Sequence, residues 1–287
     1  MMDVCCMILN YNDSETVLKL LDTIQNFSVF SHILVVDNCS TDDSYERLQT
    51  VVSDKIILIK TDKNGGYGYG NNFGAKYIQK HFNCKYVLLS NPDVVFSNEL
   101  VERFVGYMED DERLAVVSAI QHDINDEPIT DLAWKVPTSF EYAILNSSRL
   151  SKFFPTNYQL NFNRKEQYVD CVPGALLMFN LEIFLKVEGY DEEMFLFGEE
   201  TTLGFKLKES NYKTMLVLDD FYRHEHSVSI NKSIDKKSKQ LEILYKSRLL
   251  FMRKYLRSGR YMIRLAQFFQ NRTLRKLQSS NLEMIDG

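Results

Sequence analysis

Short runs of β-branched and aliphatic residues alternate with longer amphipathic segments along the first 120 residues. The apolar runs predict strands at 4–9, 33–37, 56–59, 86–90 and 114–119, and the segments between them predict helices. This alternation is typical of βαβ units around a parallel sheet. We therefore expect an α/β domain with a Rossmann-like, mostly parallel sheet and a ligand site beyond the carboxyl ends of its strands.

The periodicity fades between residues 121 and 167, where polar residues are mixed with aromatic ones. Long irregular excursions from a compact domain are often binding loops, so we assign this one to acceptor recognition. The alternative is that its aromatic side chains complete the core. Regular structure is expected again at 169–179, followed by a helix opened by acidic residues and a strand at 214–218.

The end of the chain differs in charge from the rest. From residue 231 onward there are 14 Lys and Arg against 4 Asp and Glu, a net charge of +10, so the remainder carries -15 of the total of -5. Between residues 241 and 257, apolar residues recur at helical spacing with basic residues between them. We expect a catalytic domain at 1–230 and a basic amphipathic helical tail at 231–287.

That tail suits contact with an anionic membrane surface. A solvated helical face is the alternative, and we expect no nucleic-acid partner. No apolar run approaches the roughly 18 to 20 residues that cross a bilayer, and the start of the chain lacks a basic leader. The expected location is therefore the cytoplasm, with peripheral contact at the inner face of the cell membrane.

Overall composition is that of a globular protein, with 45% hydrophobic and 25% charged residues over 287 positions. The five cysteines form no Cys-x-x-Cys pair, and most lie in or beside apolar runs. They are expected to be reduced core thiols.

Carboxylates follow two of the predicted strands. Asp37 ends the second strand, where its side chain could accept a hydrogen bond from the N3–H of uracil or thymine, or could simply form a turn with Ser40 as a cap. Asp93 ends the Asn91-Pro92-Asp93 triplet after the fourth strand. A carboxylate there could hold Mg²⁺ or Mn²⁺, although such triplets also form turns.

A glycine-rich stretch lies between the third strand and the next helix, with five glycines in residues 64–74. Glycines allow backbone N–H groups to approach a phosphate or sugar without a Cβ clash. The spacing fails the G-x-G-x-x-G pattern and follows the third strand rather than the first, which disfavours a nicotinamide-dependent oxidoreductase.

Two further groups of polar residues come later in the chain. Glu199 and Glu200 open a helix, where one of them could act as general base or both could simply complement the helix dipole. His224 and His226 follow the last strand as alternative metal ligands.

Taken in order, these segments resemble the family 2 glycosyltransferases of the GT-A fold, particularly their rhamnosyltransferase-like members. The resemblance covers residues 7–229. It rests on ILNYN at 8–12, VVDNCSTD at 35–42, NGGYGYGNNFGAK at 64–76, LLSNPDV at 88–94, CVPGALLMF at 171–179 and GYDEEMFLFGEE at 189–200, with a histidine after the last strand.

The resemblance implies an inverting hexosyl- or deoxyhexosyltransferase that uses a UDP- or dTDP-sugar, a divalent metal, and a glycan or lipid-linked acceptor. It implies that the nucleotide and donor are bound by Asn10, Tyr11, Asp37, Asn64, Gly66, Gly70, Asn71, Asn91 and Gly174. It implies metal binding by Asp93 with His224 or His226, and catalysis by Glu200 beside Glu199.

Two positions depart from the family pattern. Family members commonly carry Glu-Asp-x-Asp where this chain has Glu199-Glu200-Thr201-Thr202, so the implied base is one methylene longer and the downstream Asp is absent. Asn91 stands where many relatives have the first Asp of a DxD motif. A nucleotide-sugar-binding homologue with an impaired base is therefore the alternative.

Overall fold

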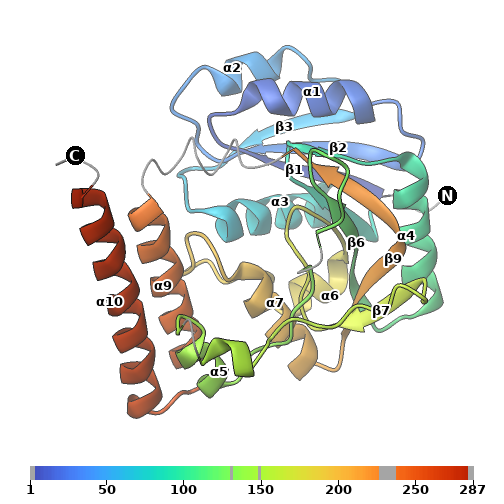
Figure 1. Cartoon of the computed structure of the whole chain (residues 1–287). Coiled ribbons are helices and arrows are strands. Elements are labelled where there is room, and N and C mark those ends of the chain that lie inside the picture. The colour runs from blue at the N-terminus through green and yellow to red at the C-terminus, as the bar shows by residue number, and fades with distance from the viewer. Residues whose placement is uncertain (1–3, 130–131, 148–149, 226–236, 284–287) are drawn as a thin grey trace.

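The computed structural model describes residues 4–129, 132–147, 150–225 and 237–283. A single mixed sheet, in the strand order β3-β2-β1-β4-β8-β6-β9-β5, forms its centre, and β7 pairs with β9 (Figure 1). The strands are β1 Val4–Asn10, β2 Phe30–Asp37, β3 Ile56–Lys60, β4 Tyr86–Ser90, β5 Val94–Val95, β6 Leu114–His122, β7 Glu166–Val169, β8 Leu176–Asn180 and β9 Lys213–His224.

Strands β1, β2, β3 and β4 are parallel to one another, which confirms the predicted βαβ pattern. The other half of the sheet is mixed, because β8 runs antiparallel to both β4 and β6 while β9 is parallel to β6. The prediction of one regular segment over 169–179 is wrong in its middle, where residues 170–175 connect β7 to β8. This break matters for the site, since it allows β8 to enter the sheet from the edge at which β4 ends.

Helices cover both faces of the sheet. Alternate residues of β1 explain this arrangement, because Val4, Cys6 and Ile8 belong to the core beneath α1 and α4, while Cys5 and Met7 belong to the core beneath α3, α6 and α7. The helices of this domain are α1 Ser14–Ile24, α2 Ser44–Gln49, α3 Tyr67–His81, α4 Asn98–Asp110, α6 Leu181–Lys186 and α7 Glu199–Glu209. The cysteines are free, and four of the five are buried, as predicted.

The segment of faded periodicity contains α5 Ser139–Ile144 and the short 3₁₀ helix Ser151–Phe153. The basic end of the chain forms α9 Lys237–Lys254 and α10 Arg260–Glu283, which lie beside α5 at one end of the molecule (Figure 1). A third hydrophobic cluster joins these elements to the domain and consists of Tyr142, Ala143, Met194, Phe251, Met252 and Ala266. Within the described ranges, no helix is long and apolar enough to span a bilayer.

Candidate functional site

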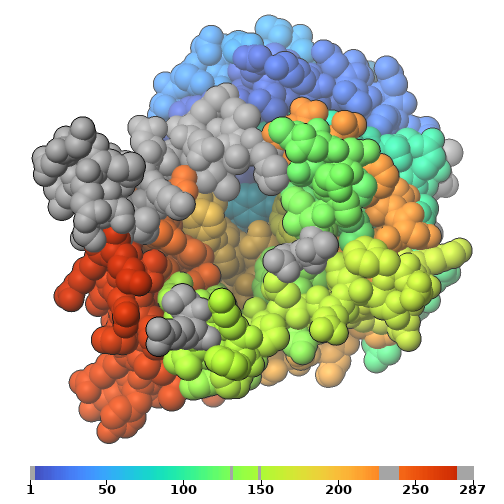
Figure 2. All heavy atoms as spheres, in the orientation of Figure 1, coloured from blue at the N-terminus to red at the C-terminus, as the bar shows by residue number. Residues whose placement is uncertain are grey.

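Polar residues from several strands meet at one edge of the sheet. Asn10 at the end of β1 pairs in register with Asp37 at the end of β2, and β4 runs parallel beside β1. Asn91 follows β4 directly, and its backbone N–H donates to the carbonyl of Ala175 at 2.8 Å. Gly174 therefore lies beside the end of β4. Figure 2 shows this face of the molecule hollowed near its centre.

The carboxylate of Asp37 organises the loop after β2. It is fully buried, and it accepts hydrogen bonds from Asn10 Nδ2 at 2.9 Å, from Ser40 Oγ at 2.6 Å and from the Ser40 backbone N–H at 2.9 Å. Tyr11 is half-buried next to this network. The predicted turn is confirmed, while contact of Asp37, Asn10 and Tyr11 with a nucleotide stays a prediction.

The glycine-rich stretch is attached to the same loop. Asn38 Nδ2 donates to Asn64 Oδ1 and to the Gly66 carbonyl, each at 3.1 Å, and Asn64 Oδ1 also accepts the Gly66 N–H. Gly66 has φ +89°, and a Cβ there would lie 2.1 Å from the carbonyl oxygen of Phe195. Only glycine suits this position. The N–H of Tyr67 then donates to the same Phe195 carbonyl at 3.0 Å, so the start of α3 is joined to the segment before α7.

Two other predicted donor residues lie deeper in α3. Gly70 packs against Leu9 of β1, inside the contact between α3 and the sheet. Asn71 is fully buried, and neither its Oδ1 nor its Nδ2 has a hydrogen-bond partner. Their contact with a donor stays a prediction, and the unpaired amide of Asn71 is unusual enough to require an explanation.

Asp93 and His224 form a pair at the end of β9. The Nε2 of His224 lies 3.1 Å from Asp93 Oδ1, because β5 pairs with the end of β9 in the register Val94 to His224 and the N–H of Glu225 donates to the Asp93 carbonyl. The two side chains are only 6% and 14% exposed for Asp93 and His224 respectively. The structure therefore brings together two predicted metal ligands that are 131 positions apart in the sequence.

This pair fits a partly protein-bound Mg²⁺ or Mn²⁺. It offers carboxylate oxygen and imidazole nitrogen, and such ions take their remaining ligands from phosphates and water. In the part of the chain that the structure describes, no cluster of three or more His, Cys, Asp and Glu side chains is placed to hold a metal. His226, the other predicted ligand, lies outside the described residues.

The proposed base lies against Gly174. The hydroxyl of Tyr67 donates to the Gly174 carbonyl at 2.9 Å, and a Cβ on Gly174 would lie only 2.7 Å from Glu200 Oε1. Burial raises the pKa of Glu200, and hydrogen bonds from the backbone N–H groups of Glu200 and Gly174 partly oppose that rise. A carboxylate with a raised pKa at a cleft wall is suited to accept a proton near neutral pH.

Glu199 faces the interior behind this base. It is 2% exposed, and its Oε1 has no hydrogen-bond partner, which is also true of the nearby Tyr190 hydroxyl. Burial, and then the charge of Glu200, raise the pKa of Glu199 well above its ordinary value. Glu199 is therefore described better by its burial near Tyr67 and Tyr190 than by stabilisation of an exposed helix start.

The two threonines of the unusual Glu-Glu-Thr-Thr segment are built into the packing. Thr201 Oγ1 accepts from Trp134 Nε1 at 3.0 Å. Thr202 is fully buried and donates to the Gly198 carbonyl at 2.9 Å. Neither position presents a carboxylate, so Glu199 and Glu200 are the two acids in the first turn of this helix. Sequence reasoning missed Asn38, Tyr67 and Phe195, whose roles depend on contacts across the fold.

Solved structures with low sequence identity share this fold. The mannosyltransferase PcManGT from Pyrobaculum calidifontis, in complex with GDP-Man and Mn²⁺, aligns with a TM-score of 0.60 and 12% identity over 98% of this chain and 79% of that one. TarS from S. aureus, residues 1–349, aligns with a TM-score of 0.52 and 14% identity over 87% of this chain and 66% of that one. The fold is GT-A.

Two curated relatives are similar in sequence. The low-salt glycan biosynthesis hexosyltransferase Agl10 of Haloferax volcanii is 26% identical over 209 residues, which cover 73% of this chain and 62% of that protein. The rhamnosyltransferase WbbL of Escherichia coli K12 is 20% identical over 218 residues, which cover 71% of this chain and 76% of that protein. The chain thus spans less than two thirds of the length of Agl10. The family model for Glycosyl transferase family 2 matches residues 5–184, and the chain belongs to this family.

Proposed function

We propose that this protein is an inverting glycosyltransferase that moves a hexosyl or deoxyhexosyl group from a nucleotide-diphosphate donor to a hydroxyl of a glycan or lipid-linked acceptor. The observation that carries the proposal is the position of Glu200. Its carboxylate lies against Gly174, at the edge of the sheet that also bears Asp37 and Asn91. The names of the relatives Agl10 and WbbL, a hexosyltransferase and a rhamnosyltransferase, support the same substrate class.

In this mechanism Glu200 removes the proton from the acceptor hydroxyl as its oxygen attacks the anomeric carbon. The new C–O bond forms on the face opposite the leaving nucleotide diphosphate, whose bond to the sugar breaks. Asp93 and His224 would hold a Mg²⁺ or Mn²⁺, which when bound neutralises charge on the leaving diphosphate. A side chain at Gly174 would collide with the carboxylate of Glu200 and the hydroxyl of Tyr67.

The donor nucleotide is the first property to test. A thermal-shift panel of UDP, dTDP and GDP sugars, each with and without Mn²⁺, is expected to show stabilisation by one nucleotide class that increases with the metal. UDP and dTDP are the expected classes, and GDP is included because PcManGT was solved with GDP-Man. If no nucleotide sugar raises the unfolding temperature, with or without Mn²⁺, the proposed function is wrong.

Turnover separates an enzyme from a binding module. Thr202 stands where the family pattern Glu-Asp-x-Asp has its second Asp. This departure favours a second candidate, a homologue that binds the nucleotide sugar without transferring it. Donor hydrolysis or transfer by the wild-type protein supports the transferase. Tight donor binding without turnover, even with suitable acceptors, supports the binding module.

We further propose that α10 contacts an anionic membrane surface at the cytoplasmic face. Arg260, Tyr261, Arg264, Phe268 and Arg272 are all exposed and fall within about 120° of the helix circumference. The opposite side of α10 is buried through Ala266 and Gln270. Arginines beside exposed aromatic rings suit a charged interface between water and lipid.

In the preceding helix, two of the basic residues that the sequence placed in its stripe make contacts within the protein, while Lys246 and Arg253 are exposed. In α9, Arg248 donates to Asn146 Oδ1 at 2.8 Å and Lys254 is paired with Asp191. Co-sedimentation with phosphatidylglycerol vesicles is expected for the wild type and reduced in the double variant Arg260→Glu/Arg264→Glu. Binding to DNA with a steep salt dependence, together with indifference to the vesicles, would replace the membrane with nucleic acid.

A further inference from the structure

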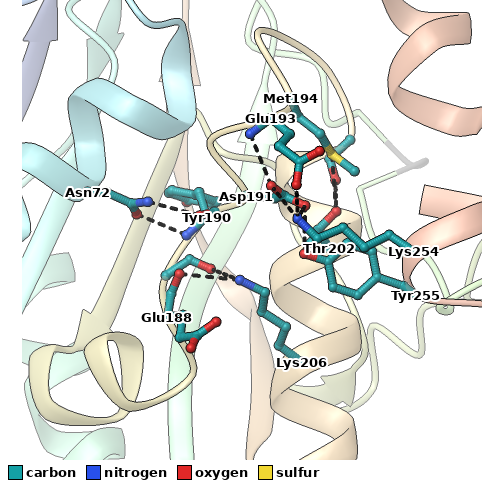
Figure 3. Close-up of polar contacts among 12 residues, drawn as sticks. Asn72, Glu188, Tyr190, Asp191, Glu193, Met194, Thr202, Lys206, Lys254 and Tyr255 are labelled. Carbon is teal, nitrogen blue, oxygen red and sulfur yellow. Dashed lines mark hydrogen bonds and ion pairs between the residues drawn. The ribbon is translucent and has the colours of Figure 1, made fainter. Parts of the chain in front are cut away.

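The C-terminal tail makes several polar and apolar contacts with the segment that precedes the proposed base. This segment, residues 189–198, is called here the approach loop, and Figure 3 shows its contacts. Asp191 in the loop is 5% exposed, and its Oδ2 accepts from Tyr255 Oη at 2.7 Å and pairs with Lys254 Nζ at 2.9 Å. Lys254 also reaches Glu193 Oε1 at 2.5 Å. We call the contacts among Asp191, Lys254 and Tyr255 the tail clamp.

Two more attachments join the same loop to α9. Ser247 Oγ donates to the Leu196 carbonyl at 3.0 Å. Met194 is 1% exposed and packs in one hydrophobic cluster with Phe251 and Met252 of α9. The loop is thus fixed to the tail at its beginning, middle and end.

From the other side, the approach loop sets the position of the base. Gly198 ends the loop and directly precedes Glu199, and its carbonyl accepts both the N–H and the Oγ1–H of Thr202 at 2.9 Å. The Phe195 carbonyl also accepts the N–H of Tyr67, whose hydroxyl holds Gly174 beside the base. A shift of the loop would therefore displace both Glu200 and its backbone partner.

Packing alone does not support the loop near the clamp. A cavity of about 410 Å³ lies there, and its lining includes Asn72, Tyr190, Lys206, Lys254 and Tyr255. Lys206 of α7 donates only to backbone carbonyls of Glu188 and Gly189, at 3.3 and 2.9 Å. Because the cavity leaves space for movement, polar contacts hold the loop on this side: those of Asp191 with the tail, and those of Asn72 with the N–H and carbonyl of Tyr190, each at 2.9 Å (Figure 3).

We propose that Lys254 and Tyr255 are positioning residues for the base, acting through Asp191 and the approach loop, so that the tail is part of the catalytic unit. This inference rests on the proposed function of Glu200. It gives α9 a role in the reaction that is independent of membrane contact by α10. A charged hydrogen bond to a buried carboxylate is among the stronger polar contacts in proteins, and its loss leaves Asp191 incompletely paired.

The test compares two clamp variants with two matched controls in the full chain. Lys254→Ala and Tyr255→Phe each remove one partner of Asp191. Arg253→Ala removes the neighbouring exposed charge on α9, and Tyr212→Phe removes a hydroxyl that instead contacts Lys186 at 3.0 Å. All four are measured by amide hydrogen exchange of peptides covering 189–203, by thermal unfolding, and by kcat and KM for donor turnover.

We expect exchange within 189–203 to accelerate at least about tenfold in both clamp variants and to stay unchanged in both controls. We also expect kcat to fall about tenfold with donor KM within about twofold, since the donor loops are untouched. Unchanged exchange, unchanged kcat, or equal losses in the controls would overturn the positioning role. If the wild type binds no nucleotide sugar and shows no turnover, the proposed function fails instead, while the exchange data still decide whether the clamp holds the loop.

Discussion

The loop after β2 and the start of α7 each contain a buried carboxylate near the proposed cleft, but the two carboxylates differ in their hydrogen-bond partners. Asp37 is surrounded by donors from Asn10 and Ser40, which engage both of its oxygens. Glu199 has an Oε1 without a hydrogen-bond partner. A buried carboxylate whose oxygens accept hydrogen bonds rigidifies a binding loop, whereas burial without such partners raises the pKa of the carboxyl group.

Under the proposed function, this difference distinguishes a donor-binding half from a reactive half. The polar groups of the β2 loop pair with one another, which suits recognition of a donor. At the start of α7, the incompletely hydrogen-bonded Glu199 is buried beside Glu200, where proton transfer is proposed. Such sites are the places where natural proteins accept a local cost in stability.

The largest expected effect comes from removal of the proposed metal ligand Asp93. Asp93→Ala is expected to lower kcat/KM at least about 1,000-fold, because the leaving diphosphate loses the charge compensation that a divalent ion provides. Donor turnover measured across a Mn²⁺ titration checks this. Asp219→Ala is the control, since it removes a carboxylate of β9, the strand that contains His224, and this carboxylate pairs with Arg103. Wild-type turnover by Asp93→Ala would refute the metal role.

Removal of the base is expected to have the next largest effect. Glu200→Gln should lower kcat by about 100- to 1,000-fold with little change in nucleotide affinity, because the amide cannot accept the hydroxyl proton. In the wild type, kcat should fall as pH decreases through the raised pKa of Glu200, since only its ionised form accepts a proton. A pH–rate profile checks this. Its acidic limb should lie above about 4.3, the value for an ordinary Glu.

Gly66 lies where the glycine-rich stretch contacts the segment before α7, and a substitution there should disrupt this contact. Gly66→Ala is expected to reduce the free energy of unfolding by about 2 to 3 kcal/mol, because φ is +89° and the new Cβ meets the Phe195 carbonyl. Urea unfolding measures the change. The matched control is Gly106→Ala in α4, where nothing lies within 4 Å, and it should stabilise the helix by about 0.5 to 1 kcal/mol. Equal effects at both sites would contradict the steric argument.

The smallest expected effect tests the buried acid itself. Because the folded-state pKa of Glu199 is raised, the folded protein binds more protons than the unfolded chain between the two pKa values, so stability decreases as pH rises through that window. Glu199→Gln removes this loss and should therefore increase the free energy of unfolding at neutral pH. Unfolding of both proteins measured from acidic to neutral pH should show their difference growing with pH. A constant difference would mean that the pKa of Glu199 is the same in the folded and unfolded states.

Sequence periodicity was sufficient for much of the fold. The predicted apolar runs are the strands β1 to β4 and β6, which are buried except for the partly exposed β3, and the helical segments between them cover both sheet faces. Periodicity could not reveal the reversal at β8, because a short apolar run has the same pattern in either direction. It also could not show that Arg248 and Lys254 of the basic tail have partners within the protein, since basic residues at helical spacing look alike until their partners are known.

The sequence by itself determined the alternating α/β order, the reduced cysteines, the ordered motifs of the family and the positions of Asp37, Asp93 and Glu200 after or before regular elements. These properties depend on local periodicity and residue chemistry, which neighbouring positions encode. Only the tertiary structure decided that Asp93 contacts His224, that Glu199 Oε1 has no hydrogen-bond partner and that Asp191 accepts a hydrogen bond from Tyr255. Pairing and burial arise from segments far apart in the chain, so the environment that tunes each carboxylate exists only after folding.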